Sequence, residues 1–236
     1  MLREFVLDTE TTGLDPKRGD RLIEIGCIEL VNRIPSGREY HRLINPDGRD
    51  VHPDAERIHG ISTASLADKP LFAAVADEFL AFIGNDGALV IHNASFDIGF
   101  LNMELGRLDR PPISTDRVVD TLTIARRKHP AGPNTLDALC KRYGVDNSKR
   151  IKHGALMDSS LLADVYVELL GERQATLGLA KASTEASAGE VRSTKAKPRP
   201  APLPSRLSPE DEAAHAKFVA SLGANAVWKK YMPGAA

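Results

Sequence analysis

Strand-like and helix-like segments alternate along residues 1–170, which limits this chain to folds in which helices cover a sheet. Short apolar or β-branched runs predict strands at 4–8, 22–31, 38–44 and 88–91, the third reached by a turn at Pro35-Ser36-Gly37. Apolar residues at helical spacing predict helices at 72–83, 96–108, 120–128, 135–143 and 155–170. Because most strands come before most helices, we expect an α/β fold with a mixed sheet rather than a strict strand–helix–strand repeat.

The composition changes after residue 170. From about 171 to 206, Ala, Ser, Thr, Gly, Lys and Pro dominate, which predicts a flexible linker at 173–206. Ser208 and Pro209 then predict the start of a short helix, with Ser208 as its N-cap. We therefore divide the chain into a domain at 1–172, the linker, and a C-terminal segment at 207–236.

Charge, hydropathy and cysteine usage restrict the class of protein. The formal net charge of the 236 residues is −1, so a nucleic-acid site has to be local. No apolar stretch is long enough to span a membrane, and no apolar leader follows Met1. Cys27 and Cys140 stand in apolar runs, which indicates core residues rather than a disulfide. We expect a cytoplasmic protein without a membrane partner.

Carboxylates stand at the ends of three predicted elements. Asp8 and Glu10 are two residues apart at the end of the first strand, so their side chains project to one face of the sheet. Asp97 falls in the first turn of the helix after strand 88–91, and Asp158 lies on the apolar stripe of the last long helix. Taken singly, each acid has a simpler explanation as a solvated residue or as a complement to a helix dipole.

The combination of acids and a histidine points to metal chemistry. Two carboxylates held side by side are unfavourable unless a cation lies between them, and oxygen ligands favour Mg²⁺ or Mn²⁺ over zinc. His153 precedes Asp158 by five residues, which places it on a loop beside that helix. A histidine suits a general base near neutral pH, although alone it would be a solvated loop residue. We expect His92, which ends an apolar strand, to be structural.

Several short motifs resemble a known family. The segments LDTETTG, VIHNASFDIGF and HGALMD, with IHGI, ADKP, LDALC and DNSKR, resemble the exonuclease motifs of the histidine-containing (DEDDh) branch of the DEDD superfamily. They are most similar to the epsilon proofreading subunits of bacterial DNA polymerase III, over most of residues 1–170. The resemblance implies a ribonuclease-H-like fold with a mixed five-stranded sheet flanked by helices. It also implies a 3′→5′ exodeoxyribonuclease that removes misincorporated nucleotides from a single-stranded DNA 3′ end.

The same resemblance implies roles for individual residues. Two divalent cations, Mg²⁺ or Mn²⁺, would be held by four acids: Asp8, Glu10, Asp97 and Asp158. His153 would be the general base that deprotonates the attacking water.

Substrate contacts are also implied by the resemblance. They would involve Asp8, Glu10, Asp158, Asp54 and His59, of which the last two match residues that touch the terminal nucleotide in the family. A member of the family has glutamate where this chain has Asp54, and Glu56 nearby is a candidate substitute. His59 can equally be a turn histidine before Gly60.

Basic residues greatly outnumber the two acids, Asp137 and Asp146, between Arg126 and His153. They are Arg126, Arg127, Lys128, Lys141, Arg142, Lys149, Arg150 and Lys152. This local excess suits a phosphate backbone, although some of these residues form a solvated helix face. We expect Asp120, Asn134 and Asp137 to be structural, because they stand at helix starts.

Two segments of the tail are predicted to bind partners. Gln174, Leu177 and Leu179, within 174–179, resemble the peptide by which this family binds the sliding clamp; the alternative is the end of helix 155–170. Trp228, the only tryptophan, has too few apolar neighbours in the sequence to form a core, and the corresponding region of the family binds the polymerase alpha subunit. Two weak sites on one tether would concentrate the nuclease near the primer end.

Two other functions are compatible with parts of the sequence. A related RNA-trimming exonuclease would share the acids and the histidine but would not need the tail. A non-catalytic adaptor with a degenerate nuclease fold would not need all five of these residues, which this chain has.

Overall fold

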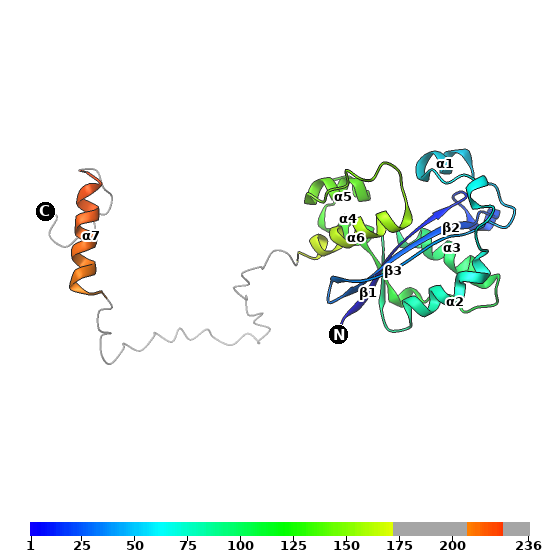
Figure 1. Ribbon diagram of the computed structural model, residues 1–236, viewed down its shortest axis with the longest axis horizontal. Helices are drawn as coiled ribbons and strands as arrows, with labels where there is room; N and C mark the ends of the chain where they lie inside the picture. Colours follow the sequence, from blue (N-terminus) through cyan, green and yellow to red (C-terminus); the bar gives the residue numbers. More distant parts are fainter. Residues whose placement is uncertain (172–206, 224–236) are drawn as a thin grey trace, which may run out of the picture. The chain divides into compact units, whose positions relative to one another are not determined.

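The computed structural model describes residues 1–171 and 207–223 (Figure 1). Within 1–171, five strands form one sheet in the order β3-β2-β1-β4-β5. The strands are β1 (Arg3–Thr11), β2 (Leu22–Val31), β3 (Ile34–Leu43), β4 (Ala88–Ile91) and β5 (Val118–Asp120). β1 pairs antiparallel with β2 and parallel with β4, so the predicted mixed five-stranded sheet is confirmed.

Helices cover both faces of this sheet (Figure 1). The helices of residues 1–171 are α1 (Pro53–His59), α2 (Phe72–Ile83), α3 (Ala94–Gly106), α4 (Thr121–Lys128), α5 (Leu136–Tyr143) and α6 (Ala155–Leu170). Single 3₁₀ turns lie at Pro16–Arg18, Ala64–Leu66 and Thr115–Arg117. Strand β2 and helices α2 and α6 have the bounds that the sequence patterns predict.

The two faces of the sheet contribute to separate apolar cores. Phe5 and Leu7 of β1 pack in one core with α2 and α3. Val6 packs in the other, with α4, α5 and α6. Because successive side chains of a strand alternate between faces, β1 is buried on both sides and stands at the centre of the sheet. Cys27 and Cys140 are buried and free, as predicted.

The turn between β2 and β3 differs from the prediction. The chain reverses at Asn32 and Arg33, which have φ values of 50° and 66°, and Val31 pairs directly with Ile34. Two consecutive residues with positive φ are typical of the two-residue turns that match strand twist. The predicted turn at 35–37 is therefore wrong, and Pro35 instead lies within β3, an edge strand, where a missing N–H is tolerated.

The second described segment contains α7 (Pro209–Ser221). Ser208 is its N-cap and forms a capping box with Asp211, which confirms the predicted helix start. The predicted clamp-binding residues Gln174, Leu177 and Leu179, and Trp228, lie outside the described residues. None of the helices within 1–171 and 207–223 combines the length and the apolar character that a membrane crossing requires.

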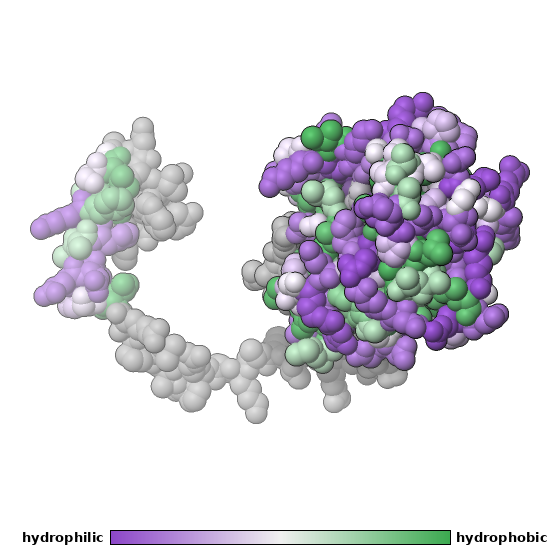
Figure 2. Space-filling model, turned by 45° about the vertical axis from the view of Figure 1, so that its right-hand side comes forward, coloured by the Kyte–Doolittle hydropathy of each residue, from purple (hydrophilic) through white to green (hydrophobic). Residues whose placement is uncertain are grey.

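The surface of residues 1–171 is polar with scattered apolar side chains on the face that Figure 2 shows. Among the exposed apolar residues are Leu14 and Ile58, which are 84% and 50% exposed. Both line a cavity beside the acidic cluster described below. Exposed apolar residues that gather at a cavity indicate a binding site, whereas isolated ones are common on any protein surface.

Candidate active site

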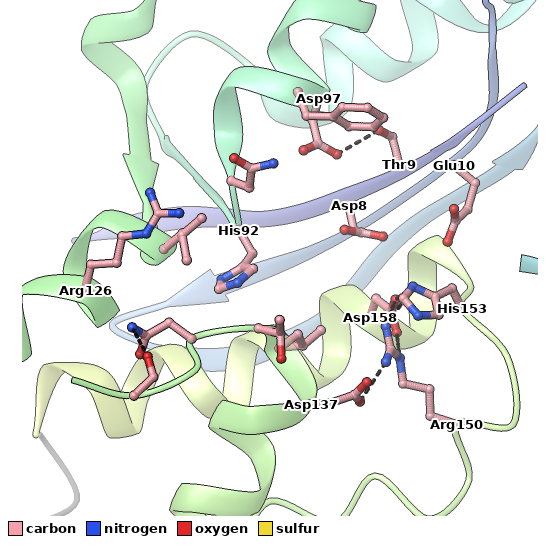
Figure 3. Close-up of a pocket in the computed structure, with 17 residues that line it drawn as sticks. Asp8, Thr9, Glu10, His92, Asp97, Arg126, Asp137, Arg150, His153 and Asp158 are labelled. Carbon is pink, nitrogen blue, oxygen red and sulfur yellow. Dashed lines mark hydrogen bonds and ion pairs between the residues drawn. The ribbon is translucent and has the colours of Figure 1, made fainter. Parts of the chain in front are cut away.

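Successive side chains of β1 point to opposite faces of the sheet, which separates Asp8 and Glu10 from Thr9. Asp8 and Glu10 follow Val6 on the face that carries α6, whereas Thr9 follows Phe5 and Leu7 on the opposite face. In Figure 3 the carboxylates of Asp8 and Glu10 lie along the strand on the side of Asp158 and His153. The two-residue spacing thus places both carboxylates in one cleft, as the sequence predicts.

Asp158 is held beside these acids because α6 approaches β2 closely. Gly26 leaves room for the start of α6, since a Cβ there would lie 2.1 Å from the carbonyl carbon of Ala155. The Ala155 N–H donates to Glu24 Oε2 at 3.0 Å, and Ser159 Oγ donates to the Gly26 carbonyl at 2.9 Å. A carboxylate at a helix N-terminus satisfies a backbone donor and complements the helix dipole.

Asp97 enters the cleft from the first turn of α3. Asn93, the N-cap residue, has a φ of 66°, and its side chain makes no capping hydrogen bond. Thr9 Oγ1 donates a 2.7 Å hydrogen bond to Asp97 Oδ1 across the buried end of β1. Thr9 therefore orients a carboxylate that is only 4% exposed.

Burial and mutual repulsion make the acids weak. Burial raises the pKa of Asp8 well above its ordinary value, and the charges of Asp97 and Glu10 raise it further. Burial, followed by the charge of Glu24, raises the pKa of Glu10 to about 8. Burial also raises the pKa of Asp97 to about 7, even though the hydrogen bond from Thr9 acts in the opposite direction. The side chains of the cleft therefore supply too little positive charge to keep all of these carboxylates ionised at neutral pH.

This excess of buried carboxylate oxygens fits hard divalent cations. One ligand atom each from Glu10, His153 and Asp158 lie within 4.8 Å of one another. The donors of the cluster are oxygens and one imidazole, and the two cysteines lie in the apolar cores. Such a donor set suits Mg²⁺ or Mn²⁺.

Arg150 belongs to the site, although in the sequence it stands out only as part of a basic stretch. Its guanidinium donates to both carboxylate oxygens of Asp158, at 2.5 and 2.6 Å, and to Asp137 at 2.7 Å. It also donates to His153 Nδ1 at 3.0 Å. Its 6% side-chain exposure distinguishes Arg150 from a solvated lysine or arginine, but this burial has no signal in the sequence.

His153 lies on the loop before α6, as predicted, and its side chain is 46% exposed. Nδ1 is 3.6 Å from Asp158 Oδ2. Burial, together with the nearby charge of Arg150, lowers the pKa of His153 below its ordinary value. The imidazole is therefore neutral at neutral pH, which is the form that accepts a proton.

The acids and His153 line a cleft of about 660 Å³. A neighbouring cavity of about 450 Å³ shares Glu10 and Phe96 with the cleft and is lined by Asp54 and His59. His59 is buried, and its Nδ1 accepts from the Ile61 N–H at 3.0 Å, so the neutral ring carries its proton on Nε2. That Nε2 has no hydrogen-bond partner among the residues that the structure describes.

The candidates for contact with the terminal nucleotide differ in their surroundings. The Asp54 side chain is 65% exposed and accepts from Arg57 Nη2 at 2.6 Å. Glu56, the proposed substitute, lines neither the cleft nor the neighbouring cavity.

Some of the residues expected to be structural cap helices, whereas others line the cleft. Asp120 caps α4 by accepting from the Leu122 N–H at 2.9 Å, and Thr135 caps α5. Asp137 binds Arg150 and also lines the cleft, so it has a structural contact and faces the site as well. His92 also lines the cleft, and its Nδ1 lies 2.9 Å from Thr121 Oγ1.

Comparisons with known proteins agree with this geometry. Residues 5–166 match the exonuclease family. The DNA polymerase III subunit epsilon of Rickettsia felis is 49% identical over 224 residues, which cover 94% of this chain and 97% of that protein. The protein of the same name from Escherichia coli K12 is 45% identical over 196 residues, which cover 80% of each.

Solved structures show the same fold. Exonuclease X in complex with 5′ overhanging duplex DNA has a TM-score of 0.56 and 26% identity, over 73% of this chain and 92% of that chain. The nuclease domain of 3′hExo, a DEDDh family member bound to rAMP, has a TM-score of 0.62 over 72% of this chain and 92% of that chain. At 16% identity this second likeness supports the fold alone. The chain belongs to the exonuclease family and, within it, to the group of DNA polymerase III epsilon subunits.

Proposed function

We propose that this protein is the proofreading 3′→5′ exonuclease of a replicative DNA polymerase, and that it hydrolyses the last phosphodiester of a primer strand with Asp8, Glu10, Asp97, Asp158 and His153. The observation that carries this proposal is the convergence of these residues, from β1, α3, α6 and the loop before α6, in one cleft. The reaction releases a nucleoside 5′-monophosphate, and a water supplies the attacking oxygen.

Asp8, Glu10, Asp97 and Asp158 would hold two divalent cations, Mg²⁺ or Mn²⁺. When bound, such cations lower the pKa of water and stabilise charge on the leaving 3′ oxygen. Their positive charge would also offset the burial and the mutual repulsion that raise the pKa values of Asp8 and Glu10.

His153 would take the proton of the attacking water at Nδ1. Arginine can only donate, so its contact with Nδ1 means that the neutral ring presents a lone pair there. The Asp158 carboxylate, 3.6 Å away, would stabilise the imidazolium, and the charge of Arg150 would favour release of the proton afterwards. Arg150 has Asp137 as a second partner at 2.7 Å, so it can move from His153 without losing every ion pair.

The cavity lined by Asp54 and His59 would hold the terminal nucleotide. His59 Nε2 is a buried donor without a partner within 1–171 and 207–223, and such atoms are costly unless a ligand satisfies them. Asp8, Glu10 and Asp158 would contact the scissile phosphate through the cations. Asp54 would reach the sugar only after it leaves Arg57, because the two side chains are paired.

We also propose a division of labour along the chain: a nuclease domain at 1–172, a linker at 173–206 and a polymerase-binding segment at 207–236. Gln174, Leu177 and Leu179 would bind the sliding clamp, and Trp228 would bind the polymerase alpha subunit. Epsilon subunits of DNA polymerase III are the relatives of this chain, which supports such partners. Action in the cytoplasm, where bacterial DNA is replicated, follows from the same role.

The test is a nuclease assay of the full chain on a primer with a 3′ mispair, with Mg²⁺ or Mn²⁺ and with a chelator. We expect degradation that the chelator stops and that the double substitution Asp8→Ala, Glu10→Ala abolishes. Asp68→Ala, which removes a carboxylate that is 78% exposed, is the matched control and should leave the rate unchanged. Activity that survives the double substitution would refute the site assignment.

The same assay separates the alternative functions. A short RNA degraded faster than the mispaired DNA primer would favour an RNA-trimming exonuclease. Full binding to the polymerase without any nuclease activity would favour an adaptor.

A further inference from the structure

The cleft continues beyond the acids to an end that none of the roles above uses. Phe96 and Glu10 connect it to the cavity for the terminal nucleotide, whereas its opposite end is lined by His92, Arg126, Gly132 and Asn134. In Figure 3 Arg126 lies far from Glu10 and His153, with His92 between them. We call this end, defined by those four residues, the Arg126 end.

Arg126 differs from the other arginine of the cleft. Arg150 is committed to Asp158, Asp137 and His153. Arg126 makes no hydrogen bond or ion pair with any residue of 1–171 or 207–223, and its side chain is exposed to the cleft. Burial lowers the pKa of His92, so that imidazole is neutral at neutral pH and adds no charge. Arg126 is therefore the available positive charge at this end.

The neighbouring basic residues have structural contacts or lie elsewhere. Lys128 donates to the Leu169 carbonyl at 3.0 Å and so caps the end of α6. Arg142 donates to the Pro133 carbonyl at 3.0 Å and fixes the loop between α4 and α5. Arg127, the next residue of α4, is exposed but does not line the cleft. The basic residues of this stretch therefore differ: Lys128 and Arg142 stabilise the fold, whereas Arg126 faces the cleft.

The wall of the Arg126 end is fixed by its own contacts. Asn134 Nδ2 donates to the carbonyls of His129 and Gly132, both at 3.1 Å. Gly132 packs against the end of the Arg142 side chain, since a Cβ at this position would lie 2.5 Å from Arg142 Nη2. A rigid wall beside a free guanidinium costs little reorganisation when an anion binds.

We propose that Arg126 binds a phosphate of the substrate strand upstream of the scissile phosphodiester. The proposal rests on the proposed function, because it requires the scissile phosphate at the acids and the terminal nucleotide in the cavity of Asp54 and His59. A strand that passes the acids and continues along the cleft brings an internal phosphate to the Arg126 end. A guanidinium matches phosphate in charge and in hydrogen-bond geometry.

The experiment compares two substrates with the full chain. One is the p-nitrophenyl ester of thymidine 5′-monophosphate, which has a single phosphodiester and no upstream strand. The other is a single-stranded oligodeoxynucleotide of about ten nucleotides, a length that fills an extended strand-binding groove. The variants are Arg126→Gln and Arg126→Lys, with Arg127→Gln as the matched control on the same helix.

We expect Arg126→Gln to raise KM for the oligonucleotide about tenfold and to leave kcat/KM for the ester unchanged. The salt dependence of oligonucleotide binding should fall by about one charge, which is the loss of one phosphate contact. Arg126→Lys should keep that salt dependence, and Arg127→Gln should behave as the unsubstituted chain. Thermal unfolding of each variant checks that the fold is intact.

Each contrary result would overturn the proposal on a different ground. Equal KM values for Arg126→Gln and Arg127→Gln would refute the phosphate contact. Equal losses on both substrates would assign Arg126 to the chemistry or to the fold instead. If the unsubstituted chain hydrolyses neither substrate, the proposed function fails and not only the role of Arg126.

Discussion

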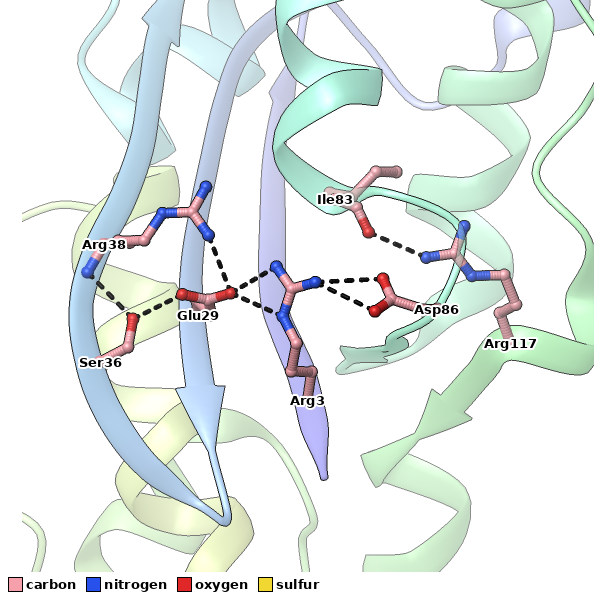
Figure 4. Close-up of polar contacts among 7 residues, drawn as sticks. All are labelled: Arg3, Glu29, Ser36, Arg38, Ile83, Asp86 and Arg117. Atoms are coloured by element: carbon pink, nitrogen blue, oxygen red, sulfur yellow. Dashed lines mark hydrogen bonds and ion pairs between the residues drawn. The ribbon is translucent and has the colours of Figure 1, made fainter. Parts of the chain in front are cut away.

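The two ends of the central strand β1 handle buried carboxylates in opposite ways. Near its start, Glu29 of β2 is 3% exposed and accepts from Arg3 at 2.6 and 2.9 Å, from Arg38 at 3.0 Å and from Ser36 at 2.7 Å (Figure 4). Burial acts to raise the pKa of Glu29, but the hydrogen bonds from Ser36 and Arg3 outweigh it and leave the pKa below its ordinary value. At the other end, the pKa values of Asp8 and Glu10 are raised.

These opposite pKa shifts distinguish carboxylates that stabilise the fold from carboxylates that serve the chemistry, within one sheet. A carboxylate whose partners are all supplied by the protein stabilises the fold, as at Glu29. Carboxylates that are buried together without enough positive charge destabilise the fold and are ready to bind cations. The protein therefore tolerates an unfavourable arrangement at the end of β1 where the chemistry occurs.

At the functional end of β1, the largest effect that we expect is the loss of activity when the proposed base, His153, is replaced. His153→Gln should lower kcat on a mispaired primer by about 10²–10⁴-fold, the range for removal of a general base. Because the side chain is 46% exposed, the free energy of unfolding should change little. Single-turnover kinetics and chemical denaturation measure the two quantities. A full rate in the variant would mean that another group takes the proton.

The next prediction concerns the pH dependence at the acidic end. The pKa of Glu10 is about 8 in the folded protein, against 4.5 ordinarily, so the folded state binds the proton more tightly. The corresponding stability is present below pH 4.5 and is lost as the pH rises through 8. Glutamine does not ionise, so Glu10→Gln should stabilise the chain at pH 9 by about 2–3 kcal/mol, with allowance for solvent screening, and much less at pH 5.

Denaturant unfolding in the presence of a chelator measures this change at the two pH values. A variant that is less stable than the unsubstituted chain at pH 9 would show that Glu10 already has a partner.

The same substitution at the other end of β1 should have the opposite sign. Glu29→Gln removes the charge that Arg3 and Arg38 share, and we expect the free energy of unfolding at pH 7 to fall by about 1–2 kcal/mol, because both partners are partly exposed. The pKa of Glu29 is lowered, so its contribution is present above the ordinary carboxylate pKa and is lost as the pH falls below it. Nuclease activity should not change. Equal pH profiles for the two glutamate variants would break the comparison.

The sequence predicts the elements better than it predicts their contacts. Apolar periodicity fixes α2 and α6 because each buries a stripe of side chains, whereas α1 and the three-residue β5 are too short to have a periodic signal and were not predicted. The turn at Asn32 and Arg33 was missed because Pro35-Ser36-Gly37 is a stronger local turn signal.

The acids of the site carried a sequence signal, but the residues that support them mostly did not. Asp8, Glu10, Asp97 and Asp158 stand at the ends of predicted elements, which is visible along the chain. Glu24 supports α6 across 131 residues, and this contact exists only after folding. A glutamate inside the apolar run LIEIGCIELV was nevertheless a usable signal, since a buried charge in a strand requires a partner.

The smallest effect that we expect comes from Thr9, whose hydrogen bond lowers the pKa of Asp97. Thr9→Val keeps the side-chain shape but removes the 2.7 Å hydrogen bond to Asp97, so the pKa of Asp97, which burial raises to about 7, should rise further. A larger fraction of Asp97 is then protonated at pH 7, and Mn²⁺ binding measured by calorimetry should weaken about fivefold, or about 1 kcal/mol. At pH 9 the carboxyl ionises in both proteins, and the difference should shrink. A loss of affinity of the same size at both pH values would show that Thr9 acts by positioning Asp97 rather than by stabilising its charge.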